Sequence, residues 1–323
     1  MPEPNPPSTV PSPPCERELM HSLALATDVP HVTVCICTYQ RLQLLRRTLD
    51  GLCHQDTQGR FTYSIAVVDN DKLRSAEQMI LDFAAMSRLA VKYCVEPRQN
   101  IALARNKVVE NADGEFLAFI DDDEFPARDW LLKLFRTCIE YNVDGVLGPV
   151  LRHFDDAPPV WLRKSRFYVR RVNPTGMQVD WHEARTGNVL LKREVIGGDA
   201  APFRPEFRAG EDQDFFRRKI SEGRKFIWCA DAEAFEVVPP ARWKRMYLVK
   251  KALLRGATAG LHCDAIGIVK SAIAIPLYTL AMPFTLLLGQ HHAMTLLVKL
   301  CDHLGKLLIL IGINPIREQY VSE

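Results

Sequence analysis

The stretch that decides the fold is "EFLAFIDDDEF", residues 115–125, in which five apolar residues run directly into four acids. An unbroken apolar run of this length is typical of a strand buried on both faces of a sheet. Four adjacent carboxylates repel one another, and solubility alone does not require them at the end of such a strand. We therefore expect the strand to hold these acids for a chemical purpose.

Strand and helix patterns alternate on both sides of this stretch. Strands are predicted at 32–38, 63–70, 90–97, 115–121 and 143–150, and helices at 41–52, 75–86, 100–112 and 126–140. Regular alternation with fully apolar strands predicts an α/β fold whose central sheet is mostly parallel and covered by helices on both faces.

The ends of three predicted strands carry polar residues: "CTYQR" (37–41), "VVDND" (67–71) and "FIDDDE" (119–124). In open α/β sheets, ligands bind beyond the carboxyl ends of the strands. We expect these three ends to lie on one rim of the sheet and to form the site.

The bulk composition is that of an ordinary globular protein, with 47% hydrophobic and 25% charged residues. A net charge of +2 provides no overall attraction for nucleic acid, so no nucleic-acid partner is predicted. The nine cysteines contain no C-x-x-C pair and are interpreted as buried free thiols in a reducing compartment. The proline-rich residues 1–30 are predicted to be a disordered tail.

The C-terminal part contains two apolar stretches. Residues 271–289 carry no charge and are about long enough to cross a bilayer, whereas charged residues interrupt 293–313. A pair of buried helices in a soluble domain is the alternative, but membrane helices tolerate Pro276 and Pro283 better. Basic residues on both outer flanks favour a membrane-associated hairpin with cytoplasmic flanks. The pattern leaves open whether the segment spans the bilayer or lies in its interface.

The acidic run suggests a metal site. Strand alternation places Asp121 and Asp123 on one side and turns Asp122 and Glu124 away, so alanine at 124 should reduce activity less than alanine at 121 or 123. Two carboxylates suit Mg²⁺ or Mn²⁺, whose coordination shell water and substrate phosphate would complete. The alternative is an acidic solvated turn, which the position after a buried strand disfavours.

Phosphate binding would rely on the metal and on basic side chains. The sequence contains neither a Walker motif nor G-x-G-x-x-G, so the P-loop and Rossmann dinucleotide interpretations lack their phosphate cradle. Arg105 and Arg41 are the candidate basic groups.

Two further segments are ambiguous on their own. Glu211, Asp212 and Asp214 open a predicted helix, where acids are favoured by the helix dipole, although one of them could be a general base. The turn 186–188 either binds sugar hydroxyls or only ends a strand.

Together these segments resemble family-2 glycosyltransferases of the GT-A fold, closest to bacterial members that build exopolysaccharides such as succinoglycan. The resemblance spans about residues 31–260, and Gln40 departs from the common T-Y-N-R form. Glu236 or Val237 stands where relatives often carry a histidine. The segments are "TVCICTYQR" (33–41), "VVDND" (67–71), "NIALARNKVVENADGEFLAFIDDDEFPARDWL" (100–131), "TGNVLLKREV" (186–195) and "FRAGEDQDFFRRKISEGRKFIWCADAEAFEVVP" (207–239).

The resemblance implies a role for each matching residue. Residues implied to bind the nucleotide sugar are Thr38, Tyr39, Arg41, Asp69, Arg105, Asp121 and Asp122. Asp121 and Asp123 would form the D-x-D pair, with Asp123 the direct metal ligand. Asp212 would be the catalytic base with Glu211 beside it, and Gly187 and Asn188 would line the acceptor or donor sugar.

The resemblance also implies an organisation and a function. Residues 31–150 would be the nucleotide-sugar half of a Rossmann-like GT-A domain, 151–260 its acceptor-binding and catalytic half, and 261–323 membrane-associated helices. The expected enzyme is an inverting, Mg²⁺- or Mn²⁺-dependent glycosyltransferase that uses a nucleotide-diphospho-sugar, with uridine as the expected base. Its acceptor would be a glycan or a polyprenyl-linked glycan at the cytoplasmic face of the bacterial inner membrane.

Two alternatives remain at this point. A nucleotidyltransferase also combines an α/β fold with acidic metal sites, but it usually carries a glycine-rich basic loop after the first strand, unlike "TYQRLQLL" (38–45). A catalytically silent sugar-nucleotide-binding membrane protein would keep the same fold, and only the intact acids argue against it.

Overall fold

The computed structural model describes residues 18–19, 29–207, 210–260, 264–313 and 315. The predicted tail, 1–30, therefore lies almost entirely outside the described residues. The chain divides into two compact units: the first comprises Met1–Leu151 and Arg171–Glu236, and the second Arg152–Arg170 and Val237–Glu323.

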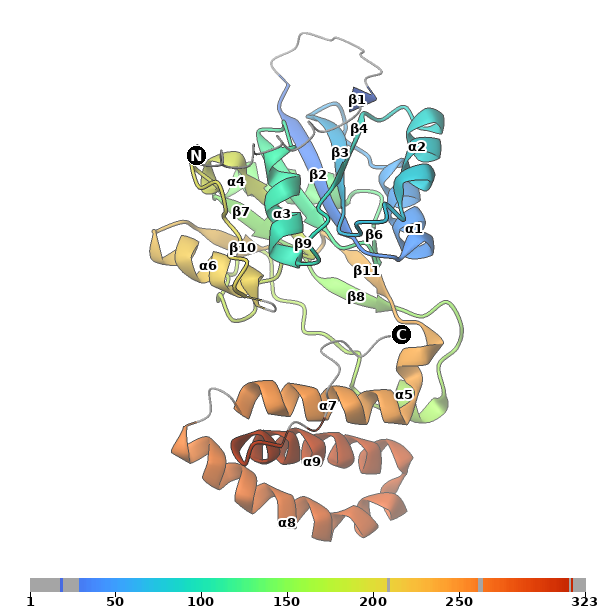
Figure 1. Cartoon of the computed structure of the whole chain (residues 1–323), viewed down its shortest axis with the longest axis vertical. Coiled ribbons are helices and arrows are strands. Elements are labelled where there is room, and N and C mark those ends of the chain that lie inside the picture. Colours follow the sequence, from blue (N-terminus) through green and yellow to red (C-terminus); the bar gives the residue numbers. More distant parts are fainter. Residues whose placement is uncertain (1–17, 20–28, 208–209, 261–263, 314, 316–323) are drawn as a thin grey trace, which may run out of the picture. The chain divides into compact units, whose positions relative to one another are not determined.

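The first unit is built on an eight-stranded sheet (Figure 1). Its strand order is β1-β4-β3-β2-β5-β9-β7-β10. The strands are Glu18–Leu19 (β1), His31–Thr38 (β2), Thr62–Asp69 (β3), Val91–Val95 (β4), Phe116–Ile120 (β5), Gly145–Leu147 (β7), Asn188–Lys192 (β9) and Phe226–Trp228 (β10). Strands β4, β3, β2 and β5 pair in parallel, as does β7 with β10, which confirms the mostly parallel sheet.

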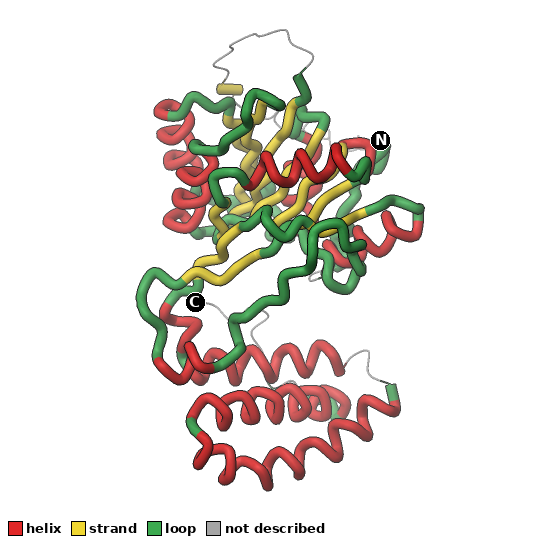
Figure 2. The backbone as a smooth tube through the Cα atoms, turned by 180° about the vertical axis from the view of Figure 1, so that it is seen from behind, coloured by secondary structure: helices red, strands yellow, loops and turns green. Residues whose placement is uncertain are grey.

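Helices cover both faces of this sheet, as predicted (Figure 2). Side chains from α1, α2 and α4 join one buried cluster, and those from α3 and α6 join the other. Alternate residues of β2 enter the two clusters: Val34 and Ile36 the first, Cys35 the second. The helices are Leu42–Leu52 (α1), Glu77–Met86 (α2), Ile101–Glu110 (α3), Trp130–Glu140 (α4) and Glu211–Ser221 (α6), with a short 3₁₀ turn at Arg193–Val195 (η1).

Strand β9 is the unexpected part of the sheet. It lies between β5 and β7 and runs antiparallel to both. Its first residue, Asn188, pairs with Ile120, the last residue of β5. This register places the turn 186–188 directly beside the acids that follow β5.

A second sheet begins within the acidic run itself. Its order is β6-β11-β8, with β6 at Glu124–Pro126, β11 at Ala234–Val237 and β8 at Val150–His153. Strand β6 was not anticipated, because three residues are too short to show periodicity. Its presence means that the acids form a connection between two strands and not a free strand end.

The cysteines of the described part of the chain, seven of the nine, are all free. Five of them are buried, and Cys37 and Cys53 are half-buried. Burial raises the pKa of Cys37 to about 12, so this thiol is neutral at physiological pH.

The second unit is helical. Its helices are Val160–Lys164 (α5), Arg245–Gly260 (α7), Ala265–Leu288 (α8) and Gln290–Leu310 (α9), with a 3₁₀ turn at Pro240–Trp243 (η2). Helix α8 is the one described helix that is long and apolar enough to cross a membrane, and only 11% of its most apolar window is buried. The interpretation of a buried helix pair is therefore wrong for α8. The helical region begins at Arg245, ahead of the predicted boundary at 261.

Candidate functional site

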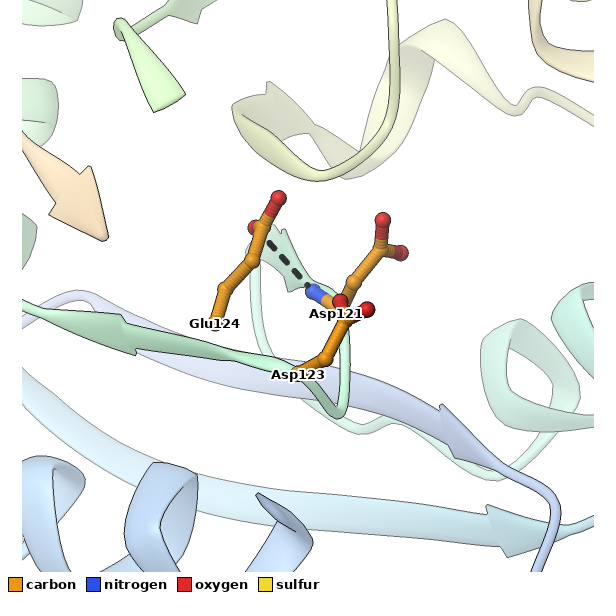
Figure 3. A group of neighbouring side chains, drawn as sticks. All are labelled: Asp121, Asp123 and Glu124. Carbon is orange, nitrogen blue, oxygen red and sulfur yellow. Dashed lines mark hydrogen bonds between the residues drawn. The ribbon is translucent and has the colours of Figure 1, made fainter. Parts of the chain in front are cut away.

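The acidic run folds as a tight turn between β5 and β6. The backbone N–H of Glu124 donates to the carbonyl oxygen of Asp121 at 3.2 Å, which closes the turn. A turn breaks the strand alternation on which the prediction for Glu124 rested. Glu124 consequently points to the same side as Asp121 and Asp123, and one of its carboxylate oxygens accepts the Asp121 N–H at 3.4 Å (Figure 3).

Three carboxylates therefore gather at this turn. Oxygen atoms of Asp121, Asp123 and Glu124 all lie within 4.8 Å of one another. Glu124 and Asp123 are buried, and Asp121 is partly exposed. The predicted D-x-D pair is present, and Glu124 is a third member that strand periodicity assigned to the opposite side.

Asp122 points away from this cluster and holds the turn in place. Its carboxylate accepts the Thr38 hydroxyl at 2.8 Å and the Arg41 guanidinium at 3.2 Å. Arg41 also lies 3.2 Å from a carboxylate oxygen of Asp123. Burial raises the pKa of Asp122 to about 7, although the Arg41 charge opposes this shift. Thr38 and Arg41 thus tie the end of β2 to the acidic turn.

Gly187 provides the space in which the carboxylates gather. A Cβ atom at this position would lie 2.8 Å from an oxygen of Glu124 and 3.0 Å from an oxygen of Asp121. Real Cβ contacts are essentially never shorter than 3.0 Å. The predicted turn residue therefore lines the site, and it does so because it has no side chain.

Asn188, predicted to line the acceptor or donor sugar, has its side chain engaged within the core. Its side chain is buried, accepts the Trp130 indole N–H at 2.7 Å, and donates to the carbonyl oxygens of Pro149 and Ala232 at 2.9 and 2.8 Å. Both amide hydrogens are thus used within the protein. Asn188 pins β9 to neighbouring segments of the core.

Arg105 connects the acidic turn to helix α6. This buried side chain of α3 forms a hydrogen-bonded ion pair with Glu211 and lies 3.8 Å from Asp121. Burial raises the pKa of Asp121 to about 6. The Arg105 charge lowers this pKa, but burial together with the Asp123 and Asp212 charges outweighs it. The carboxylates at this turn repel one another, and a bound cation would stabilise their charged forms.

The three acids that open α6 have different surroundings. Glu211 is paired with Arg105, and Asp214 is buried with ion pairs to Arg217 at 3.0 Å and Arg218 at 2.9 Å. Asp212 is half-buried and makes no ion pair with any described residue; one oxygen accepts the N–H of Gln213 at 2.8 Å. Asp212 is therefore the carboxylate of this helix that is left to accept a proton.

Asp69, predicted to contact the nucleotide base, has its carboxylate engaged within the protein. It is fully buried and accepts hydrogen bonds from the Asp71 and Ala76 backbone N–H groups and from the Tyr93 hydroxyl, at 3.0, 2.8 and 3.1 Å. These bonds fix the loop that follows β3. Burial raises the pKa of Asp69, and the hydrogen bonds only partly offset this effect.

Asp71 is the acid at this strand end that sequence reasoning did not single out. It accepts the amide of Gln40 at 3.0 Å, which links the loops after β2 and β3. Gln40 has a left-handed backbone with φ of 54°, a conformation that asparagine adopts more readily than glutamine. Tyr39, beside it, is 39% exposed and lies at the rim as predicted.

Glu236 lies in β11, next to the acidic turn. It pairs with Glu124, and Phe235 stacks on Phe125 with ring centroids 5.3 Å apart. Directly paired residues share a face, so the phenylalanines mark one face and the two glutamates the other. A fourth carboxylate therefore lies on the side of the cluster, at the position where the sequence analysis noted a missing histidine.

An aromatic pair near α6 was also missed. Trp181 stacks on His182 with ring centroids 3.5 Å apart, and His182 Nδ1 lies 2.7 Å from Asp180. The amide of Gln213 donates to the carbonyl oxygen of His182 at 2.8 Å. These contacts hold the loop beside Asp212, and no spacing in the sequence connects the two segments.

Comparisons at the level of sequence identify a family. A model of glycosyl transferase family 2 matches residues 33–204. The succinoglycan biosynthesis protein ExoM of Rhizobium meliloti is 31% identical over 238 residues, which cover 73% of this chain and 76% of the relative. The glycosyltransferase AglE of Haloferax volcanii is 24% identical over 212 residues, covering 64% and 67% of the two chains.

Solved structures share the fold. The mannosyltransferase PcManGT from Pyrobaculum calidifontis, in complex with GDP-Man and Mn²⁺, aligns with a TM-score of 0.56 and 19% identity over 87% of this chain and 88% of the other. Residues 1–349 of TarS from S. aureus, in complex with UDP, align with a TM-score of 0.52 and 15% identity over 90% and 93% of the chains. Identities this low establish the fold alone.

Proposed function

The chain belongs to glycosyl transferase family 2 and is a glycosyltransferase, and we propose that it uses a UDP-linked sugar to extend a bacterial surface polysaccharide. The acceptor would be a hydroxyl of a glycan or of a polyprenyl-linked glycan. The observation that carries this proposal is the group of three carboxylates at the end of β5, which Arg105 links to Glu211, the neighbour of Asp212 at the start of α6. Similarity to a succinoglycan biosynthesis protein supports the class of product.

The carboxylate cluster suits a divalent cation. All the groups are hard oxygen donors, Gly187 leaves space beside them, and the pKa of Asp121 is raised by burial and, to a lesser extent, by the Asp123 charge. Asp123 and Asp121 would hold Mg²⁺ or Mn²⁺, with Glu124 as a third donor. Such an ion would offset negative charge on the departing nucleoside diphosphate.

The remaining chemistry falls to side chains of this chain. Asp212 takes the proton from the acceptor hydroxyl, whose oxygen then attacks the anomeric carbon of the donor. The bond from that carbon to the diphosphate breaks, and its electron pair leaves with the phosphate oxygen. One displacement inverts the anomeric centre. Glu211 keeps the Arg105 guanidinium in position between the base and the acidic turn.

A cytoplasmic membrane face is the proposed place of work. Helix α8 is apolar enough to associate with a bilayer, and its exposed side is available to do so. An enzyme bound to the membrane meets a lipid-linked acceptor at a raised effective concentration.

The proposal is tested with the full-length chain, a panel of nucleotide sugars, Mn²⁺ or Mg²⁺, and membranes that supply polyprenyl-linked glycans. We expect release of a nucleoside diphosphate that depends on the acceptor, and a product whose anomeric configuration is opposite to that of the donor, read by NMR. Asp82→Asn, on the exposed surface of α2, is the matched control for Asp212→Asn.

Two results would overturn the proposal. Pyrophosphate release from a nucleoside triphosphate and a sugar phosphate would indicate a nucleotidyltransferase. Tight UDP binding by a wild-type chain that transfers none of the sugars would indicate a silent binding protein. Activity that survives both EDTA and Asp123→Ala would remove the metal from the proposal.

A further inference from the structure

The helices of the second unit form a stack with α9 in the middle (Figure 1). Helices α7 and α9 run in the same direction and stay side by side along their length. Near their starts Arg245 donates to Gln290 at 2.7 Å, and farther along Arg255 pairs with Asp302 at 2.9 Å. Near their ends Gly260 packs against Ile309.

Glycines bring α7 and α9 into backbone contact. A Cβ at Gly256 would overlap the carbonyl oxygen of Asp302, and one at Gly305 would overlap that of Leu253. Gly256 and Gly260 are four residues apart and face the same neighbour. The two helices are therefore packed backbone to backbone, and neither can enter a membrane without the other following alongside it.

Helix α8 lies along the other side of α9, and the chain turns at Gly289 between the two helices. Its Ser271 hydroxyl lies 2.9 Å from Nδ1 of His303, and Tyr278 lies 5.8 Å from the His303 ring. The opposite side of α8 is uncovered. Side chains spaced three or four residues apart form one apolar stripe, each more than half exposed: Ile266, Val269, Ile273, Leu277, Leu280, Phe284 and Leu287.

The other side of the stack is basic. Arg245, Lys250, Lys251 and Arg255 of α7 are exposed, and residues 245–310 contain seven basic and two acidic side chains. The second unit thus presents an apolar stripe on α8 and positive charge on α7, with α9 between them.

This arrangement is incompatible with a spanning α8. If α8 crossed the bilayer, α9 would cross with it, and α7 would follow because of its backbone contact with α9. The exposed ion pair of Arg255 and Asp302 would then lie in the hydrocarbon together with Lys250 and Lys251. Charged side chains are strongly disfavoured there.

We infer that the second unit is an interfacial anchor, in which α8 lies parallel to the membrane plane with its apolar stripe below the headgroups of an anionic leaflet. Interfacial helices bury their apolar face by about 5–10 Å, and packed helix axes lie about 8–10 Å apart. Helix α9 is then at headgroup depth. Helix α7 faces water, near enough for its cations to feel the surface charge. This inference does not depend on the proposed reaction.

Vesicle flotation of the full-length chain tests the partner. We expect binding to phosphatidylcholine vesicles that contain phosphatidylglycerol, and binding about tenfold weaker without that anionic lipid or in high salt. Leu280→Glu should reduce binding at least tenfold. Leu73→Glu, an equally exposed leucine of the first unit, should leave it unchanged. Binding unaffected by Leu280→Glu would overturn the inference.

Cysteine labelling on sealed vesicles tests the orientation. Gln290→Cys and Thr258→Cys place thiols at opposite ends of the stack, both exposed, with the wild-type chain as background. For a helix lying in the interface, a membrane-impermeant maleimide added outside should label both ends equally. Protection of one end until detergent is added would show that the helices span. A chain that ignores vesicles and sediments as a dimer, reverting to a monomer in Leu280→Glu, would show that a second copy covers the stripe.

Discussion

The acids after β5 and the acids that open α6 look alike in the sequence but have opposite surroundings. At the first cluster three carboxylates face one another within 4.8 Å, and the two arginines near them, Arg41 and Arg105, are shared with Asp122 and Glu211. At the second cluster Glu211 and Asp214 are paired with arginines. Carboxylates paired with arginines are typical of a structural role, whereas a surplus of carboxylates that face one another marks a place for an external cation. Composition alone does not distinguish these cases.

The strongest test of this contrast is to remove a carboxylate from the first cluster. Asp123→Ala and Glu124→Ala should each lower sugar transfer by about 10³-fold, because losing several kcal/mol of metal-dependent stabilisation has that effect. Initial rates measured over a range of Mn²⁺ concentrations check this expectation. Asp113→Ala, on an exposed turn, is the control. A mild effect of Glu124→Ala alone would show that Glu124 does not act with the other two carboxylates, as strand alternation predicted.

At the second cluster, replacing an acid by its amide should affect catalysis at one position and folding stability at the other. Asp212→Asn should reduce the rate of transfer by about 10²–10⁴-fold, because a general base contributes that much, while UDP affinity and the melting temperature stay unchanged. Glu211→Gln should instead lower the melting temperature, because it leaves the buried Arg105 charge with only the more distant Asp121 carboxylate, 3.8 Å away. Calorimetry with UDP and thermal unfolding distinguish the two variants.

Gly187 lies against the first cluster, and a side chain at this position should impair it. Gly187→Ala forces a carbon against the carboxylates of Asp121 and Glu124, and we expect apparent Mn²⁺ affinity to fall by about 10–100-fold, as for other changes beside metal ligands. Gly198→Ala, where a Cβ meets nothing within 4 Å, is the matched control. Equal Mn²⁺ affinity in both variants would show that the cluster can open without loss.

Replacing Asp214 should lower the stability of the folded chain and leave the rate of sugar transfer unchanged. Burial, the largest single influence, raises its pKa, but hydrogen bonds from Arg218 and Arg217 and the Arg218 and Arg204 charges outweigh it, so the pKa is lowered overall. A lowered pKa stabilises the folded chain fully above the unfolded value of about 3.9, and this contribution is lost as pH falls through the folded value.

Asp214→Asn should therefore reduce the free energy of unfolding by about 2–3 kcal/mol at pH 7. The difference between the two chains should begin to shrink below about pH 4 and disappear only below the lowered pKa of folded Asp214. Urea unfolding at pH 7, 5 and 3.5 measures this, and a constant difference across that range would show that the ion pairs are not the cause.

Much of the fold can be predicted from the sequence, because most strands and helices are specified by residues within the segment itself. The apolar strands from 32 to 120 and the helices between them show their periodicity within single segments, and the structure contains all of them. Strand β9 was not predicted as antiparallel, because the apolar run 189–191 carries no information about direction. Strands β6 and β11 are too short for a pattern.

The site residues divide in the same way. Asp121 and Asp123 were found from their position after a strand, whereas Glu124 was misplaced because a single turn reversed the alternation. Asn188 and Asp69 have residue types that suit ligands, but partners elsewhere in the chain use their polar atoms. Such pairings exist only after folding, so no local pattern could have excluded these residues.

The proposed anchoring of α8 at a leaflet would change how the concentration of substrate has to be expressed. An enzyme held in the plane of a leaflet meets a lipid-linked acceptor by lateral diffusion, so its rate follows the mole fraction of acceptor among lipids. Adding inert phospholipid at constant total acceptor and enzyme would slow the reaction by surface dilution. Apparent Michaelis constants for such a chain are properties of a two-dimensional solution.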